Sequence, residues 1–328
     1  MKKSYLLAIV LLIVIIGGTM GGLYATGYFK PAETSTEKIT IGILTGDLHH
    51  LALHVAIKNG YFMNYNLTVE TRTYNNGPDL MLDFVSGTLD FAYVGVPPAM
   101  TARANAMASG NVTNLPIAIS SVNLEGSAII VNPSRISTVS DLNGSTIGTP
   151  GAGTIQDILL TIYSQQNNLT IIKHEAAGVS NLPLFYQQGT IDGLIAWEPT
   201  PALTINNYNA SLLLTSHDLF PNHQCCVLVV NQNLYNQHPD IVLKMIAIHE
   251  AATSFISSNS TEAAQIAVNY TGLPLSVVQT AFNTVIYDTT INRESCATFL
   301  SALISLGRVP SLNQSQVDSF LDAFIKQQ

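Results

Sequence analysis

The stretch that decides the fold is "MLDFVSGTLDFAYVGVPPA" (81–99), because a second stretch, "LFYQQGTIDGLIAWEPTPA" (184–202), follows the same plan. Each runs from helix-like sequence into Gly-Thr-Leu/Ile-Asp, then into an apolar strand, and then into a loop that contains proline. Gly87 and Gly189 suit the C-terminal caps of the two helices. The strands are expected at "FAYVG" and "GLIAW", and the repeat indicates two similar halves.

Each copy follows a matching opening unit. The segments "KITIGILTGDLHHLALHVAIKNGYF" (38–62) and "GSTIGTPGAGTIQDILLTIYSQQ" (144–166) both read as strand, tight loop and helix. Alternation of strands and helices predicts an α/β protein with two lobes, each built on a mainly parallel sheet. We expect lobe I to comprise 38–126 and 229–328, with helices from about residue 239 closing over it. Lobe II is expected at 127–228.

The N-terminus predicts a membrane segment. After Lys2 and Lys3, residues 4–29 carry no charge, and about 20 apolar residues span a bilayer. The leading lysines favour a cytoplasmic N-terminus. We expect residues 1–30 to be an uncleaved anchor, with a cleaved signal peptide as the alternative. Residues 31–37 then form a polar tether, and the remaining chain lies on the extracytoplasmic side.

Charge and cysteine content exclude several classes of protein. The chain has 13 Lys and Arg against 21 Asp and Glu, a formal net charge of −8, which argues against nucleic acid or an anionic membrane surface as the main partner. Its three cysteines are Cys225, Cys226 and Cys296, and no CxxC pattern occurs. Neither a disulfide framework nor a zinc site is therefore expected, and buried free thiols are predicted.

Four loops are the candidate site. In open α/β sheets, ligands bind beyond the carboxyl ends of the strands. That rule selects Thr45–His50, Tyr93–Pro98, Thr149–Gln156 and Trp197–Thr200. With two lobes, these loops would face one another across a cleft that closes on a small molecule about a hinge.

Three histidines crowd the first of these loops. In "GDLHHLALHVAIKNGYF" (46–62), apolar residues recur at helical spacing from Leu48. This pattern places His50 and His54 on the opposite, solvated face of a helix, with an i, i+4 metal-binding pair as the alternative. His49 lies in the first helical turn, just after Asp47, at the carboxyl end of the strand. There it is as consistent with lining the cleft as with packing inside the lobe.

The other loops offer further candidates. The helix start "GTPGAGTIQD" (148–157) includes Gly153 and Thr154, and its free N–H groups attract anions, although a capped helix turn explains it as well. Trp197 is either core or a flat wall for a ligand. Glu198 either accepts a donor from a ligand or holds a loop in place.

Four remaining residues, in two segments, are expected to have structural roles. His223, Cys225 and Cys226 lie where the chain returns between the lobes, and packing is expected there ahead of a role in the cleft. Arg103 follows the helix start at Pro97-Pro98, and a surface salt bridge is expected for it ahead of an anion contact.

These motifs together resemble the nitrate/sulfonate/taurine class of solute-binding proteins of ABC transporters. The matching segments are "IGILTGDLHHLALHVAIKNGYF", "VSGTLDFAYVGVPPAMTARAN", "DLNGSTIGTPGAGTIQDILL", "GTIDGLIAWEP" and "HQCCVLVVNQNLYNQHPDIV". The resemblance implies a two-lobed periplasmic-binding-protein fold of type II. It also implies a monomer that delivers a small solute to a membrane permease and its ATPase, outside the cytoplasm.

The resemblance and the loops together give the expected ligand-binding residues, which are Thr45, Asp47, His49, Tyr93, Gly95, Gly153, Thr154, Trp197, Glu198 and His223. No catalytic residue, metal or cofactor is expected. The solute would be a small anion or a polar organic molecule. Because the four loops lack Lys and Arg, a strongly charged ligand is disfavoured. The acidic residues fit a ligand with donors, such as an amino-sulfonate or a pyrimidine.

Two other functions compete. The yeast-type thiamine-pyrimidine synthase resembles these proteins, but its fuller cysteine-rich run is reduced here to the pair at 225–226, and no G-x-S-x-G motif occurs. A ligand-sensing ectodomain is the other alternative. We therefore expect a binding protein and not an enzyme.

Overall fold

The computed structural model describes residues 36–327, and the chain from Lys38 onward forms one compact unit. The predicted anchor, residues 1–30, lies outside the described residues. The predicted tether, residues 31–37, also lies outside them except for its last two residues.

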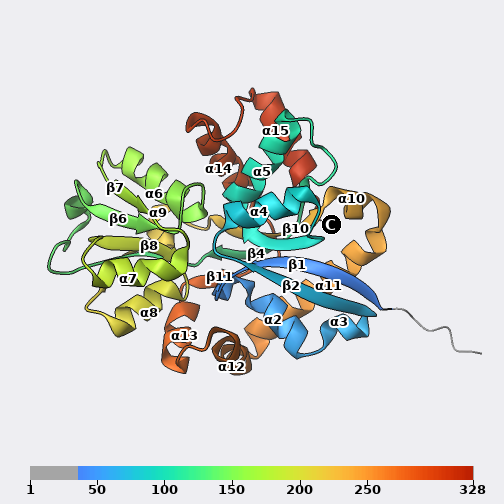
Figure 1. Cartoon of the computed structure of the whole chain (residues 1–328), viewed down its shortest axis with the longest axis horizontal. Helices are drawn as coiled ribbons and strands as arrows, with labels where there is room; N and C mark the ends of the chain where they lie inside the picture. The colour runs from blue at the N-terminus through green and yellow to red at the C-terminus, as the bar shows by residue number, and fades with distance from the viewer. Residues whose placement is uncertain (1–35, 328) are drawn as a thin grey trace, which may run out of the picture. The chain divides into compact units, whose positions relative to one another are not determined.

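Six strands form the first sheet, in the spatial order β11-β4-β10-β3-β1-β2 (Figure 1). Every residue of β3 and of β10 is buried, as is typical of central strands covered by helices on both faces. In chain order the strands are β1 (Glu37–Leu44), β2 (Leu67–Tyr74), β3 (Phe91–Gly95), β4 (Pro116–Glu125), β10 (Gln224–Asn231) and β11 (Val285–Tyr287).

Five strands form the second sheet, in the order β7-β6-β8-β5-β9. They are β5 (Ser127–Val131), β6 (Thr146–Thr149), β7 (Ile172–Glu175), β8 (Gly193–Trp197) and β9 (Ser211–Thr215). The two strands of the sequence repeat are confirmed residue for residue as β3 and β8. The glycines of the repeat both adopt positive φ, 87° at Gly87 and 70° at Gly189. Gly87 is the C-cap of helix α4 (Gly77–Ser86), and Gly189 follows the C-cap residue of α7 (Leu182–Gln187).

The α/β class with two sheets is confirmed, but the strands are mixed and not mainly parallel. In the first sheet β1 is parallel to β3, whereas β10 runs antiparallel to both β3 and β4. In the second, β6 is parallel to β7 and β8, whereas β5 runs antiparallel to β8 and β9. The antiparallel strands β5 and β10 are the ones that receive the chain when it passes from one sheet to the other.

The predicted lobe boundaries can be compared with the sheet to which each strand belongs. The change after residue 126 falls between β4 and β5, where the chain leaves the first sheet. The predicted return at 228/229 falls inside β10, all of which belongs to the first sheet. The chain therefore re-enters the first sheet at Gln224.

Helices cover the sheets (Figure 1). Besides α4 and α7, the first part of the chain contributes α2 (Leu51–Lys58), α3 (Tyr61–Asn64), α5 (Val96–Ala108), α6 (Ile155–Gln166), α8 (Thr200–Asn207) and α9 (Ser216–Leu219). The later part contributes α10 (Gln232–Gln237), α11 (Pro239–Ser258), α12 (Ser260–Thr271), α13 (Leu275–Phe282), α14 (Arg293–Ser305) and α15 (Gln314–Phe324). Short 3₁₀ turns lie at Leu48–His50, Val139–Leu142 and Val179–Asn181.

The C-terminal helices contact both halves of the unit. As expected, α11 and α12 pack against α2, and α15 packs against β4 of the first sheet. However, α13 packs against α8, and α14 packs against α6 as well as α5. By length and composition α11 could cross a membrane, but its buried residues and its contacts with α2 and β4 are those of a core helix.

Arg103 corrects one expectation. It is buried, and its Nη1 donates to the carbonyl oxygen of Pro116 at 2.9 Å, while its guanidinium lies over the ring of Phe320. The surface salt bridge predicted for Arg103 is therefore wrong, because α14 packs on α5 and Phe320 of α15 lies against the guanidinium.

Candidate functional site

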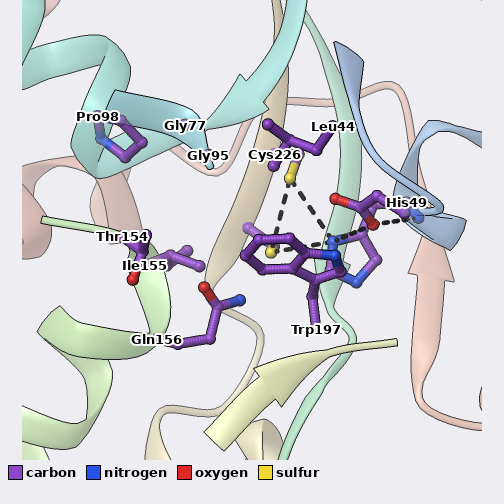
Figure 2. Close-up of a pocket in the computed structure, with 12 residues that line it drawn as sticks. Leu44, His49, Gly77, Gly95, Pro98, Thr154, Ile155, Gln156, Trp197 and Cys226 are labelled. Atoms are coloured by element: carbon purple, nitrogen blue, oxygen red, sulfur yellow. Dashed lines mark hydrogen bonds and ion pairs between the residues drawn. The ribbon is translucent and has the colours of Figure 1, made fainter. Parts of the chain in front are cut away.

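A narrow pocket with a cavity volume of about 20 Å³, partly open to solvent, lies between elements of the two sheets (Figure 2). The carboxyl ends of β1, β3 and β8 and the starts of α4, α5 and α6 meet there, as the rule for α/β sheets predicts, and the beginning of β10 joins them. Its lining residues are Leu44, Asp47, His49, Gly77, Gly95, Pro98, Thr154, Ile155, Gln156, Trp197, Cys225 and Cys226.

Five of the ten predicted ligand-binding residues lie in this pocket, and they come from all four predicted loops. They are Asp47, His49, Gly95, Thr154 and Trp197. Seven further lining residues were not among the ten: Leu44, Gly77, Pro98, Ile155, Gln156, Cys225 and Cys226.

The other five predicted residues do not line the pocket. Thr45 is exposed, and its hydroxyl donates to the carbonyl oxygen of Tyr74. Tyr93 is buried beside the first sheet, where its hydroxyl pairs with His249 Nδ1 at 3.0 Å. Gly153 borders a separate apolar groove between α4 and α5. The remaining two, Glu198 and His223, are buried in contacts with the protein itself.

His223 and Glu198 hold loops in place. The Nδ1 of His223 donates to the carbonyl oxygen of Phe220 at 2.6 Å. Glu198 accepts hydrogen bonds from the Ala202 N–H at 3.2 Å and the Thr284 hydroxyl at 3.3 Å. Burial raises the pKa of Glu198 to about 7 despite these donors.

Two thiols and one imidazole form a cluster in the pocket. The Sγ atoms of Cys225 and Cys226 lie 3.8 Å apart, and each lies 3.6 Å from His49 Nδ1 (Figure 2). The other ring nitrogen, His49 Nε2, lies 2.8 Å from the carbonyl oxygen of Gly126 and donates to it. All three side chains are buried, and the predicted free, buried state of both thiols is confirmed.

Neighbouring groups shift the pKa values of His49, Asp47 and Cys225 in this cluster. Burial opposes the imidazolium of His49, but Asp47 and Cys225 outweigh it and raise the pKa to about 10. Burial raises the pKa of Asp47 to about 6, although His49 counteracts it. Burial opposes the Cys225 thiolate too, yet its Cys226 hydrogen bond and His49 hold the pKa well below its usual range.

Strand irregularity explains why both sulfurs face one nitrogen. Successive side chains of a regular strand point to opposite faces. In β10, however, the register with β4 shifts on both sides of Cys226, as in a β-bulge, which re-aims a side chain. Adjacent cysteines at 225 and 226 can therefore both lie within contact of His49.

His50 and His54 do not form a solvated helix face, and that prediction is wrong. His50 belongs to the 3₁₀ turn and is fully buried, with its Nδ1 accepting from the Leu44 N–H. His54 is half-buried and stacks on Tyr270 with ring centroids 3.8 Å apart. The reason is that α11 and α12, distant in sequence, cover α2.

Two buried polar atoms in the pocket have no hydrogen-bond partner among the described residues. They are Nε1 of Trp197, a donor, and Oε1 of Gln156, an acceptor. The Nε2 of Gln156 donates to Ser127 Oγ at 2.9 Å. Buried polar groups in native proteins are nearly always paired, so this donor and acceptor are suited to a polar molecule in the pocket.

The chain crosses between the sheets twice, and the crossings are hydrogen-bonded to each other. The Glu125 N–H donates to the carbonyl oxygen of His223. Glu125 Oε1 accepts from the Asn222 N–H at 2.7 Å and from His217 Nδ1 at 2.6 Å. Glu125 and Asn222 adopt φ of 58° and 55°, values that non-glycine residues seldom adopt.

The first crossing has glycine at position 126, where the ring of His49 leaves no room for a side chain. With φ at 87°, a Cβ added there would lie 2.3 Å from His49 Nε2. We expect Gly126→Ala to displace the imidazole and to lower the free energy of unfolding by at least about 1 kcal/mol more than Gly144→Ala. Gly144 has a similar φ of 81° with open space around its Cβ position. Urea unfolding of both variants measures the difference, and equal losses would contradict the contact.

Two curated relatives are described as binding proteins. A putative binding protein of Brucella abortus (strain 2308) is 25% identical over 224 residues, covering 66% of this chain and 66% of that protein. The match thus spans just under two thirds of that relative. A putative aliphatic sulfonates-binding protein of Bacillus subtilis (strain 168) is 23% identical over 290 residues, covering 85% of this chain and 81% of that protein.

Solved structures share the fold. The periplasmic nitrate-binding protein NrtA from Synechocystis PCC 6803 superposes with a TM-score of 0.76 at 14% identity, covering 89% of this chain and 86% of that one. The ligand-binding component of an ABC-type import system from Staphylococcus aureus, with zinc bound, gives 0.73 at 21% identity, covering 89% and 97%. The two-sheet architecture is therefore the periplasmic-binding-protein fold.

A family model matches the greater part of the chain. It describes the NMT1-like family and covers residues 32–270, a range that includes both crossings and every residue that lines the pocket. The chain belongs to the NMT1-like family.

Proposed function

We propose that this chain is the extracytoplasmic solute-binding protein of an ABC importer. It binds a small polar solute in the pocket between the two sheets and delivers it, unaltered, to a membrane permease. The N-terminal segment, residues 1–30, holds it at the membrane. Family membership and the relatives' descriptions as binding proteins support this function. The same descriptions favour binding over an enzymatic role.

The observation that carries the proposal is the unpaired donor and acceptor in the pocket. Trp197 Nε1 and Gln156 Oε1 are both buried, and both residues line the narrow pocket, which would have to open for a solute to enter. A solute with one acceptor and one donor would pair both atoms and remove the cost of burying them unpaired. The two hydrogen-bonded crossings provide the hinge about which the halves would close on that solute.

The lining also bears on the chemistry of the solute. The described residues around the pocket include no Lys or Arg, whereas Asp47 contributes a carboxyl group. These features favour a polar organic solute that carries donors, such as an amino-sulfonate or a pyrimidine. An oxyanion such as nitrate would have to rely on backbone N–H groups at the start of α6, where Thr154 is the N-cap.

A solute panel tests the proposal. The full-length chain is screened by thermal shift against nitrate, alkanesulfonates, taurine and pyrimidines, and hits are titrated by calorimetry. We expect at least one hit to bind with one site per chain and to contract the molecule in solution scattering. A complete absence of binding across the panel, or recovery of a chemically changed solute, would overturn the proposed function.

Gln156 supplies a sharper test. Gln156→Ala removes the unpaired acceptor, and we expect it to weaken binding of the solute about 10-fold, the usual value of one hydrogen bond in a desolvated site. Gln165→Ala is the matched control, because Gln165 lies on the same helix but is exposed. Calorimetry of both variants provides the comparison, and equal affinities would place the solute elsewhere.

A further inference from the structure

We propose that His49, Cys225 and Cys226 form a binding site for one thiophilic divalent metal ion such as Zn²⁺, held within the solute pocket. The sequence predicted no metal site, because neither a CxxC pair nor a regular spacing of ligands occurs. The folded chain instead brings together one residue after β1 and two residues of a bulged strand. These three side chains are buried and line the same pocket.

The distances match the edges of a metal tetrahedron. With Zn–S of about 2.3 Å and Zn–N of about 2.0–2.1 Å, tetrahedral angles place two sulfurs about 3.8 Å apart, and a sulfur and a nitrogen about 3.6 Å apart. The observed separations are 3.8 Å between the sulfurs and 3.6 Å from each sulfur to His49 Nδ1. One ion can therefore contact all three atoms without movement of the backbone.

The hydrogen bond at the far side of the ring fixes the ligand atom. His49 Nε2 donates to the carbonyl oxygen of Gly126 at 2.8 Å, so Nε2 keeps its hydrogen and the lone pair of the neutral ring lies on Nδ1, toward the sulfurs. Metal-binding histidines usually donate their second N–H to a carbonyl or carboxylate in this way. Binding displaces the protons carried by the thiol groups and by Nδ1.

His50 is excluded as a ligand by the same reasoning. A second group, formed by Asp47, His50 and Cys226, also brings three donor atoms near one another. However, His50 Nδ1 accepts a hydrogen bond from the Leu44 N–H at 3.2 Å. Its hydrogen therefore lies on Nε2, 3.6 Å from Asp47 Oδ2, and that nitrogen has no lone pair for a metal. The ion belongs to the first group.

Three protein ligands leave a tetrahedral ion one position for a water or solute atom. Because no Lys or Arg is found among the described lining residues, the ion would supply positive charge to hold an anionic group of the solute. This role in solute binding rests on the proposed function, whereas metal binding itself rests only on the cluster.

The test uses the full-length, untagged chain, reduced and stripped of metal with a chelator. Zn²⁺ is titrated by calorimetry, and Co²⁺ is titrated while its absorption is recorded. We expect one ion per chain, with the strong visible bands of tetrahedral Co²⁺ and a sulfur-to-cobalt charge-transfer band. Failure of the unmodified chain to show saturable binding or the charge-transfer band would overturn the site, whatever the variants do.

Variants identify the ligands. Cys225→Ser, Cys226→Ser and His49→Gln should each lower the affinity for Zn²⁺ at least 100-fold. Cys296→Ser is the control, because Cys296 is also a buried free thiol but lies in α14, outside the pocket lining. Thermal unfolding in chelator establishes that each variant is folded. Equal Zn²⁺ affinity in the Cys226→Ser and Cys296→Ser proteins would contradict the proposal.

Solute titrations separate this inference from the proposed function. A solute that binds the chelator-treated chain, and binds more tightly after Zn²⁺ is added, supports both. Zn²⁺ binding in a chain that binds no solute from the panel would support the metal site and overturn the proposed function. A solute that binds equally well with and without Zn²⁺ would overturn the role of the metal in holding the solute.

Discussion

Replacing Trp197 with alanine should weaken solute binding about 100-fold or more. The indole is almost fully buried, lines the pocket and carries an N–H with no partner among the described residues. Large aromatic side chains at the centre of a desolvated site are the positions where truncation costs most. Calorimetry with the solute identified by the panel measures the loss, and far-UV circular dichroism establishes that the variant is folded.

Trp197→Phe is the matched control. It keeps an aromatic wall and most of the buried area but removes the N–H donor, so we expect a smaller loss of about 10-fold. The control is needed because Trp→Ala in a core also costs about 3–5 kcal/mol of stability. If both variants bind the solute as tightly as the unmodified chain, Trp197 is a core residue and not a wall of the binding site.

The second large effect concerns Glu198 and pH. Burial raises its pKa from 4.5 to about 7, so the folded state holds the proton more tightly than the unfolded state. A group of this kind makes the protein less stable as pH rises from about 4.5 to above 7. The rise in pKa corresponds to about 3 kcal/mol. Glu198→Gln, which cannot ionise, should remove this loss.

The prediction concerns how the free energy of unfolding changes with pH, and not its value at one pH. The free energy of unfolding of Glu198→Gln minus that of the unmodified chain should increase by about 3 kcal/mol between pH 4.5 and pH 8. A constant offset is expected from the changed hydrogen bonds to Ala202 and Thr284, and it does not affect the slope. Glu262→Gln is the control, because Glu262 is exposed on α12. Parallel pH profiles for both variants would show that Glu198 is not a buried, neutral acid.

The sequence was sufficient to predict what depends on local pattern. Alternation of apolar runs with helix-like segments located β3 and β8, and the rule that ligands bind at strand ends selected four loops that all reach the pocket. Within each loop, however, the rule also selected residues that do not line the pocket. Thr45 and Gly153 are loop residues whose side chain or backbone turns away from the pocket, and such orientations depend on φ and ψ values that composition does not determine.

What could not be predicted depends on contacts between distant segments. Local periodicity assigns His50 and His54 to a solvated helix face. However, His50 lies in a buried 3₁₀ turn before α2, and α11 and α12 cover the helix that carries His54. Cys225 and Cys226 should alternate across a strand, but the register with β4 shifts on both sides of Cys226, and both sulfurs lie near His49. The adjacent cysteines were the one feature of the sequence that pointed to this cluster. The sequence does not reveal that His49 lies beside them in the folded chain.

The most direct test of the central claim, that a solute binds between the two sheets, uses the intrinsic fluorescence of the chain. Trp197 is its single tryptophan and lines the pocket, so tryptophan emission reports on that site alone. Titration with the solute should change the emission saturably, with the dissociation constant that calorimetry gives, and Gln156→Ala should shift both curves equally. A solute that calorimetry shows to be bound, but that leaves the emission of Trp197 unchanged, would contradict the account.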